Sequence, residues 1–189
     1  GIEFNPSSRE LLDRFEADGF GFGCRDGLTK RLLESNGYVS TVFTGCPAWY
    51  DLGKVDADRL LVEPKRNEIR NIAVSDPAIL RNIDAPRHLI AELQGAFPSA
   101  KIKLVFHRGW NEDAYTDHDL ARAQTSLADW ARANGVEPVD IAYSHAGFAE
   151  YDRCDLHVGY RVHAHLYNVS QRKPSYLIEE DGRGYGANE

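Results

Sequence analysis

The chain has 189 residues and a formal net charge of −7 at pH 7, with 42% hydrophobic and 11% aromatic residues. This composition is typical of one folded domain with a substantial core, and the acidic balance argues against nucleic acid as the main partner. The three cysteines, Cys24, Cys46 and Cys154, form no CxxC pair. We therefore expect neither a metal site nor a disulfide scaffold, but a reduced, cytoplasmic protein. No apolar run approaches the roughly 20 residues of a membrane-spanning helix.

We expect a single domain over residues 1–189. The first four residues, GIEF, are interpreted as a cloning remnant, and the absence of methionine indicates a fragment of a longer protein. Residues 53–68 are polar and without periodicity, so they are expected to form a surface connection.

The N-terminal third begins with a helical pattern. Residues 7–19, SSRELLDRFEADG, predict a helix that opens with a capping box of Ser7 and Glu10 and buries Leu11, Leu12 and Phe15. The next segments are predicted as a strand (GFGCR, 21–25), a helix (GLTKRLLESNG, 27–37) and a strand (YVSTVFTG, 38–45). Asp26 is the expected N-cap of that helix.

From residue 69 onward strands and helices alternate regularly. Strands are predicted over 69–76, 101–107, 138–144, 156–160 and 175–180, and helices over 85–97, 117–135 and 161–173. The alternation predicts βαβ units, hence a Rossmann-like, three-layer α/β domain with a mostly parallel sheet. The strands are almost continuously apolar, as expected when helices cover both faces of the sheet.

In such sheets ligands bind at the carboxyl ends of the strands. Polar residues that directly follow predicted strands are therefore candidate binding residues. They are Arg25, Asp26, Ser75, Asp76, His107, Arg108, Arg161, His163, Glu180, Asp181 and, just beyond, Arg183. For most of them a capping, turn or surface role is an equally good local explanation.

The segment DLHVGYRVHAH, residues 155–165, is the richest in such side chains. His157 falls inside a buried strand and is interpreted as a core histidine. Arg161 and His163 fall at the start of the next helix, where free N–H groups and the helix dipole favour an anion. An arginine there can bind a phosphate or carboxylate, and a histidine can carry a proton near neutral pH.

Taken together, the segments GFGCRDGLTKRLLESNG, TVFTGCPAW and DLHVGYRVHAHLYNVSQRKPSYLIEEDGRG resemble the polysaccharide pyruvyl transferase family. The resemblance rests on Arg-Asp before a helix, a Gly-Cys-Pro turn, and a later Arg-x-His-Ala helix followed by Lys-Pro and the last strand. These segments run in the expected order over about two thirds of the chain.

The resemblance implies one half of a glycosyltransferase-B-like enzyme that moves the pyruvyl group of phosphoenolpyruvate onto a sugar hydroxyl pair, with no cofactor. Arg161 and Arg25 would hold the donor, and His163 would act as general acid–base. Asp26, Ser75, Asp76, His107, Arg108, Glu180, Asp181 and Arg183 remain candidate substrate-binding residues. The acceptor would be a saccharide, either free or linked to a lipid, and the reaction would take place in the cytoplasm, at the inner face of the membrane in the lipid-linked case.

The chain also departs from the family pattern. Val162 stands where a leucine is commoner, and EEDGRG (179–184) stands where many relatives carry a lysine, which puts the contacts there in doubt. The N-terminal half that the family is expected to have is largely missing. We therefore expect it to complete the cleft, and the isolated chain to have little or no activity.

Two other functions fit the same segments. One is a glycosyltransferase-B nucleotide-sugar domain, with the carboxylates of residues 179–181 on a ribose and Arg161 on the diphosphate. The other is a non-catalytic module for glycan binding or assembly.

Overall fold

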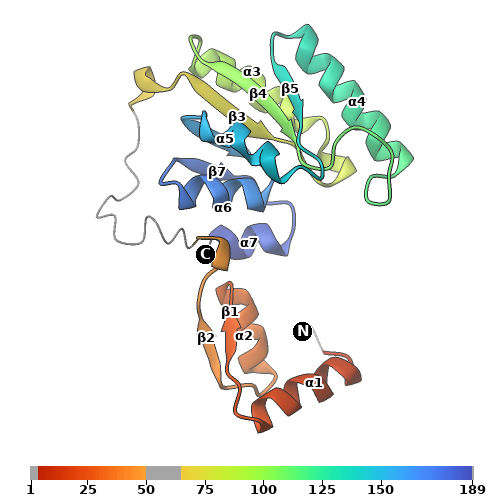
Figure 1. Cartoon of the computed structure of the whole chain (residues 1–189), viewed down its shortest axis with the longest axis vertical. Helices are drawn as coiled ribbons and strands as arrows, with labels where there is room; N and C mark the ends of the chain where they lie inside the picture. Colours follow the sequence, from red (N-terminus) through yellow and green to blue (C-terminus); the bar gives the residue numbers. More distant parts are fainter. Residues whose placement is uncertain (1–3, 50–64, 189) are drawn as a thin grey trace.

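The structure, a computed structural model, describes residues 4–49 and 65–188. Its strands form two parallel sheets rather than one (Figure 1). The smaller pairs β1 (Phe22–Cys24) with β2 (Thr41–Phe43). The larger has the order β5-β4-β3-β6-β7, where β3 is Asn71–Ser75, β4 Lys101–Phe106, β5 Glu137–Asp140, β6 Leu156–Gly159 and β7 Ser175–Leu177.

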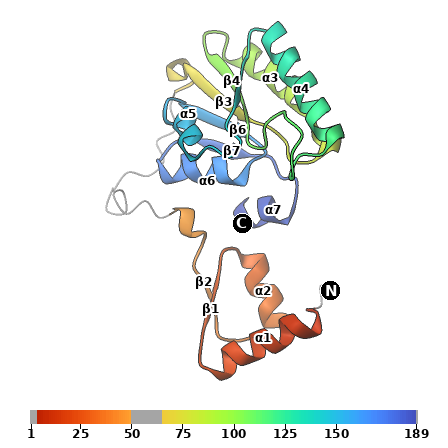
Figure 2. The same cartoon turned by 45° about the vertical axis from the view of Figure 1, so that its right-hand side comes forward.

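All of the predicted strands therefore exist, and the five-stranded sheet is parallel throughout. Helices cover both of its faces, as Figure 2 shows: α3 (Ala85–Ala96) and α4 (His118–Ala133) lie on one face, α5 (Ala149–Asp152) and α6 (Val162–Ser170) on the other. The predicted Rossmann-like α/β architecture is confirmed.

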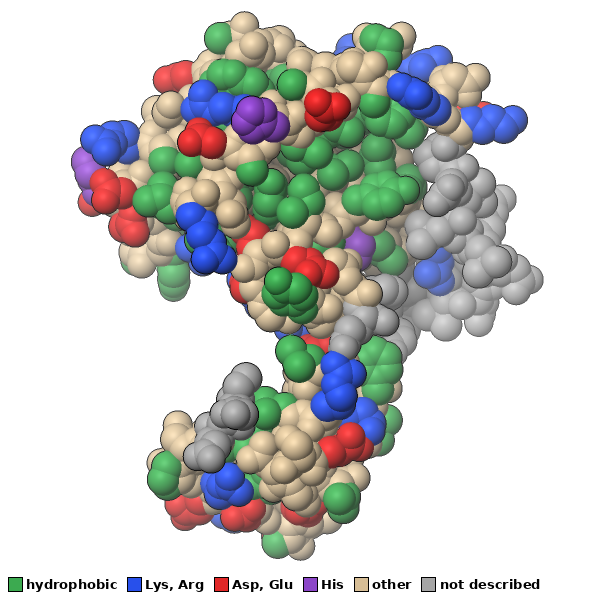
Figure 3. All heavy atoms as spheres, turned by 180° about the vertical axis from the view of Figure 1, so that it is seen from behind, with side chains coloured by type: hydrophobic (Ala, Val, Ile, Leu, Met, Phe, Trp, Pro, Cys, Tyr) green, Lys and Arg blue, Asp and Glu red, His purple; other side chains and the backbone are tan. Residues whose placement is uncertain are grey.

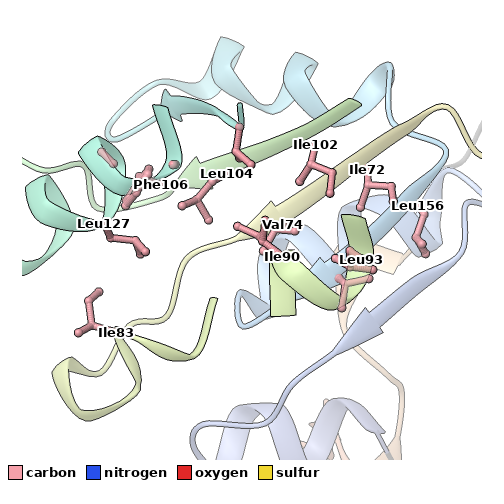
Figure 4. Packing of buried hydrophobic residues seen from close by; sticks show 14 of the residues in the cluster. Ile72, Val74, Ile83, Ile90, Leu93, Ile102, Leu104, Phe106, Leu127 and Leu156 are labelled. Atoms are coloured by element: carbon pink, nitrogen blue, oxygen red, sulfur yellow. The ribbon is translucent and has the colours of Figure 1, made fainter. Parts of the chain in front are cut away.

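The alternation of side chains along β3 explains the two-sided core. Ile72 and Val74 point to the face covered by α3 and α4, while Ala73 points to the face covered by α5 and α6. The first core is the larger, with Ile90 and Leu127 of the two helices fully buried (Figure 4). A strand apolar on both faces is what a covered parallel sheet requires.

The β1–β2 pair forms a separate small lobe with α1 (Pro6–Ala17) and α2 (Gly27–Ser35). Its core is small: Cys24, Leu33 and Tyr38, with Phe4, Leu12 and Phe22 packed against them. In Figure 3 this lobe joins the larger body over a narrow waist. We did not predict the split, because a period-2 apolar pattern identifies a strand but not the sheet that it joins.

Two local predictions for α1 are wrong. Asn5, not Ser7, caps the helix, since the Asn5 side chain accepts a hydrogen bond from the Ser8 N–H at 2.8 Å and Pro6 occupies the first helical position. Leu11 and Phe15 are exposed, and only Leu12 packs into the lobe. The small lobe has too little surface to cover that helix.

At the other end of the chain, residues 182–188 form a helix, α7 (Gly182–Asn188), which the glycine-rich sequence did not predict. We expected residues 53–68 to form a surface connection, and the first part of this range, residues 53–64, lies outside the described residues. Residues 65–68 are exposed and contain the short 3-10 turn η2 (Arg66–Glu68). The further 3-10 turns are η1 (Pro47–Trp49), η3 (Leu80–Asn82) and η4 (His145–Phe148).

Candidate active site

The carboxyl ends of β3 and β6 are joined by a buried ion pair. Arg161 donates from Nε to Asp76 Oδ1 at 2.8 Å and from NH2 to Oδ2 at 2.6 Å. The Asp76 side chain is 0% exposed and that of Arg161 only 11%. Gly159 permits this approach, because a Cβ there would lie 2.4 Å from Ser75 Oγ.

Further contacts fix this pair in place. Asp76 also accepts from the His107 backbone N–H at 3.1 Å and from Gln124 Nε2 at 3.1 Å, and the Arg161 N–H donates to Ser75 Oγ at 3.0 Å. Burial opposes the charge on Arg161, but the Asp76 carboxylate outweighs it and raises the pKa of the guanidinium. Arg161 is therefore held as a cation against Asp76, with its Nε edge turned toward protein rather than solvent.

Behind the pair lie neutral histidines. The His157 ring meets Ser75 Oγ at 3.0 Å and Ser175 Oγ at 2.7 Å, and His165 meets the same Ser175 oxygen at 2.9 Å. Burial lowers the pKa of His157 to about 3, aided by the neighbouring His165 and His107. The interpretation of His157 as a core histidine is correct, and His165, which we could not assign from sequence, shares its hydrogen-bonding partner.

His107 belongs to the same layer. Its Nε2 lies 2.7 Å from the Tyr151 hydroxyl, and burial lowers its pKa to about 4 although Asp76 opposes the shift. The His107 side chain is thus hydrogen-bonded to a buried tyrosine. This partner lies 44 residues further along the chain, and local sequence patterns did not indicate it.

His163, in contrast, is exposed at the start of α6. It lines a small pocket of about 40 Å³ with Tyr160, Arg161, Asp181 and Arg183. Partial burial lowers its pKa, and the positive charges of Arg183, Arg25 and Arg161 lower it further. A pKa below the ordinary value leaves His163 largely neutral at pH 7, inside a cluster of cations.

Next to that pocket lies a larger, open groove of about 700 Å³ between α2 and α7, and Asp181 and Arg183 line both. Arg25 lines the groove and is 43% exposed, with only a loose 3.6 Å ion pair to Asp26. The floor is apolar, formed by Leu28 and Leu32. Both Arg25 and Arg183 line this groove, although they are 158 positions apart in the sequence.

Asp26 connects the small lobe to α7. Its carboxylate caps α2 by accepting from the Thr29 N–H at 2.7 Å, as predicted. Gly186 lies against it so closely that a Cβ at this glycine would be 2.7 Å from Asp26 Cβ. The contact holds the beginning of α2, and with it Arg25, near His163.

The remaining candidate residues form hydrogen bonds and ion pairs that hold the surrounding loops in place. Glu180 accepts from the Ala78 N–H at 2.7 Å and from Asn82 Nδ2 at 2.8 Å, which ties the end of β7 to the loop after β3. Asp181 forms a bidentate ion pair with Arg183, with NH2 to Oδ2 at 2.6 Å. Arg108 donates to the Tyr115 carbonyl at 3.3 Å and lies two strands from His163 along the sheet edge.

Two features escaped the sequence reading. Arg31 lines the α2–α7 groove, on the face of α2 that also carries Leu28 and Leu32. Helical spacing alone places these residues together, so the signal was present. Trp110, in the loop after β4, packs edge-to-face on Phe106 at the border of the core, with ring centroids 5.2 Å apart.

A second large cavity, about 470 Å³, lies at the opposite, amino edge of the sheet among Asn71, Lys101 and Glu137. Parallel α/β sheets bind their ligands at the other edge, and one cation of this cavity, Lys103, is paired with Glu150 at 2.7 Å and with Glu137 at 3.5 Å. Within residues 4–49 and 65–188, no group of three or more His, Cys, Asp or Glu side chains is placed to bind a metal ion. None of the helices in these parts of the chain is long and apolar enough to cross a membrane.

The fold and this site define a class: an α/β protein with an exposed histidine among arginines at the carboxyl edge of a parallel sheet. The family model described as polysaccharide pyruvyl transferase matches residues 2–182, and the chain belongs to that family. The matched segment includes residues 2–4 of the supposed cloning remnant, and Phe4 packs on Tyr38 with ring centroids 6.2 Å apart. No curated protein and no solved structure shows a significant match to the chain.

Proposed function

We propose that this chain carries the donor half of a pyruvyl transferase site, which transfers the pyruvyl group of phosphoenolpyruvate to a pair of sugar hydroxyls. One observation carries the proposal: His163 is neutral and exposed, and it is surrounded by Arg25, Arg161 and Arg183 beside an open groove. Phosphoenolpyruvate brings a phosphate and a carboxylate, and such a cationic opening complements both.

The pocket of about 40 Å³ around His163 has room for little more than a water molecule. The donor would therefore lie in the α2–α7 groove, with its reacting carbon turned toward His163. Arg25 and Arg183 would bind its anionic groups directly. Arg161, locked to Asp76, would act through its fixed positive charge and by placing the start of α6.

The reaction needs protons moved at defined atoms. In the proposed order, a sugar hydroxyl adds to C2 of the enolpyruvyl group while the C3 methylene gains a proton. A second hydroxyl then replaces phosphate at C2, and its proton leaves with the phosphate. Neutral His163 would take the first hydroxyl proton, and the bound anion would raise its pKa, so that it can return that proton to C3. The arginines would stabilise the departing phosphate.

We also propose that an N-terminal half outside these 189 residues completes the cleft, and that the enzyme acts on the cytoplasmic side, at the inner face of the membrane. The small sheet supports the first part. Parallel sheets are normally covered on both faces, yet Val42 and Phe43 of β2 are 59% and 57% exposed. A larger sheet built onto the β1–β2 lobe would cover them.

The direct test is phosphate release from phosphoenolpyruvate with galactosyl, mannosyl and glucosyl acceptors, using the full-length protein. We expect release that depends on acceptor and is lost by at least a hundredfold in His163→Ala, because general acid–base catalysis contributes on the order of 10²–10⁴. Unchanged turnover in both His163→Ala and Arg25→Ala would refute the site. Stabilisation of the protein by a nucleotide sugar, with none by phosphoenolpyruvate, would favour a glycosyltransferase instead.

A further inference from the structure

Two tyrosines stand out on the surface near the same edge of the sheet. Tyr115 and Tyr143 are 69% and 71% exposed, the most exposed aromatic side chains among the residues described. Tyr115 lies in the loop between β4 and α4, and Tyr143 follows β5. Their ring centroids are 6.1 Å apart with planes inclined by 44°, so two exposed aromatic rings lie next to each other.

This surface is held in place rather than loose. The Tyr143 hydroxyl donates to Asp113 Oδ2 at 2.9 Å, while Asp113 Oδ1 accepts from the backbone N–H groups of Tyr115 at 2.7 Å and Thr116 at 2.9 Å. Arg108 donates to the Tyr115 carbonyl at 3.3 Å. One carboxylate thus holds the Tyr143 ring through its hydroxyl and the Tyr115 backbone through its N–H, which places the two residues side by side before any ligand binds.

The backbone at Tyr143 adds a second observation. Its φ is 56°, one of two positive values at non-glycine residues within the described parts of the chain. A bulky residue in this left-handed region costs free energy, and such conformations gather at ligand-binding sites. Here the residue with the strained backbone, Tyr143, has its ring exposed to solvent beside the exposed ring of Tyr115.

Flat apolar rings bordered by a carboxylate and a guanidinium match one ligand chemistry well. A sugar ring presents an apolar face of C–H groups that stacks on an aromatic ring, and hydroxyls at its rim that bond to charged side chains. Asp113 and Arg108 lie at the border of the tyrosine pair, where such hydroxyls would fall.

The position fits an extended saccharide. Along the sheet order β5-β4-β3-β6, the loops that carry the tyrosines lie two and three strands from the start of α6. Neighbouring strands are about 4.8 Å apart, so the ends of β4 and β5, from which these loops start, lie roughly 10–15 Å along the edge from the end of β6. A chain of a few sugar units spans that distance.

We infer that Tyr115 and Tyr143 form a saccharide-binding platform, which holds a sugar unit of the acceptor at a distance from the reacting hydroxyls. The inference rests on the proposed function in one respect, that the acceptor is a glycan. The platform itself requires no catalysis, so it can be tested by binding alone.

The experiment measures the affinity of this chain for tetrasaccharides of galactose, mannose and glucose, by chemical-shift titration. We expect at least one to bind in the millimolar range or tighter, and Tyr115→Ala or Tyr143→Ala to weaken it on the order of tenfold, through lost stacking surface. Tyr143→Phe, which keeps the ring, should weaken it by no more than about threefold. Tyr176→Ala is the matched control, an equally exposed tyrosine (58%) on β7.

Tyr143→Gly guards against a folding artefact, because glycine adopts a positive φ without strain while removing the ring. It should bind saccharide as poorly as Tyr143→Ala. The inference is overturned if no tetrasaccharide binds the unmodified chain, if Tyr176→Ala weakens binding as much as the platform variants do, or if the platform variants bind sugar normally. Loss of phosphoenolpyruvate binding in the platform variants would also overturn it. A lack of phosphate release together with tyrosine-dependent sugar binding would reject the proposed function alone.

Discussion

At the scale of single residues, the site combines side chains that are locked with side chains that are free to react. Arg161 and Asp76 are buried against each other, whereas His163 and Arg25 face solvent. Sequence reasoning selected all four, because each follows a strand at the carboxyl edge of the sheet. It could not separate the locked from the free ones, since that depends on partners far along the chain: Asp76 reaches Arg161 85 positions away.

Replacing Asp76 tests how much the locked pair matters. In Asp76→Ala the buried guanidinium of Arg161 loses its carboxylate, and we expect the free energy of unfolding in urea to fall by about 3–5 kcal/mol. Asp129→Ala is the control. Asp129 forms an ion pair with Arg132, and because the two side chains are 68% and 52% exposed, this pair should contribute less than about 1 kcal/mol to the free energy of unfolding. Equal losses in the two variants would contradict the buried ion pair.

The buried histidines predict how stability depends on pH. The pKa values of His157 and His107 are lowered to about 3 and about 4, so both stay neutral in the folded protein while the unfolded chain binds protons below its ordinary pKa of about 6.5. The contribution of these two histidines to the free energy of unfolding is fully present above about pH 6.5. As pH falls from about 6.5 toward 4, we expect the free energy of unfolding to drop by about 1.4 kcal/mol per pH unit for each histidine.

Urea unfolding at pH 7, 6 and 5 measures this slope. The acidic groups with lowered pKa, Asp26, Glu34, Asp113 and Asp181, lose their contributions only below about pH 4.5, so they do not confuse the measurement. Stability that stays level from pH 7 to pH 5 would show that these histidines are solvated.

At the scale of elements, α7 decides where Arg25 lies. Gly186 permits α7 to touch the Asp26 cap of α2, and any Cβ there would meet Asp26 at 2.7 Å. We expect Gly186→Ala to push the two helices apart, which costs about 1–3 kcal/mol of stability. It should also raise the pKa of His163, because the charge of Arg25 moves away.

Gly182→Ala is the matched control, since nothing lies within 4 Å of a Cβ at that position. The His163 pKa is read from NMR titration of its imidazole signals in Gly186→Ala, in Arg25→Ala and in the double variant. If Gly186 acts through Arg25, adding Gly186→Ala to Arg25→Ala changes the pKa no further. A full additional shift in the double variant would disprove the coupling.

Most elements could be predicted from the sequence, and their assembly only in part. The apolar runs of β3, β4 and β6 and the helical periods of α3 and α4 identify a parallel α/β sheet, because each pattern is local. The division into two sheets and the helix α7 depend on packing that no local pattern records. The tyrosine pair needed strand order as well, because only the adjacency of β4 and β5 places Tyr115 beside Tyr143.

At the scale of the whole molecule, the open groove lies between two bodies, the β1–β2 lobe and the five-stranded domain. Arg25 comes from the first, and Arg161, His163 and Arg183 from the second. Members of the polysaccharide pyruvyl transferase family need a donor and an acceptor to meet, and a groove between two bodies offers a face to each. We therefore propose that the donor binds at the waist and the acceptor along the edge of the larger sheet.

One measurement tests this central claim most directly: titration of the chain with phosphoenolpyruvate while the imidazole signals of His163 are followed by NMR at several pH values. The account predicts that saturating phosphoenolpyruvate raises the His163 pKa in the unmodified chain, because the bound anion offsets the arginine charges, and that Arg25→Ala and Arg183→Ala weaken that binding. Arg122→Ala, an exposed arginine of α4, should behave like the unmodified chain. Phosphoenolpyruvate that leaves the His163 signals unmoved, or binds equally well without Arg25 and Arg183, would contradict it.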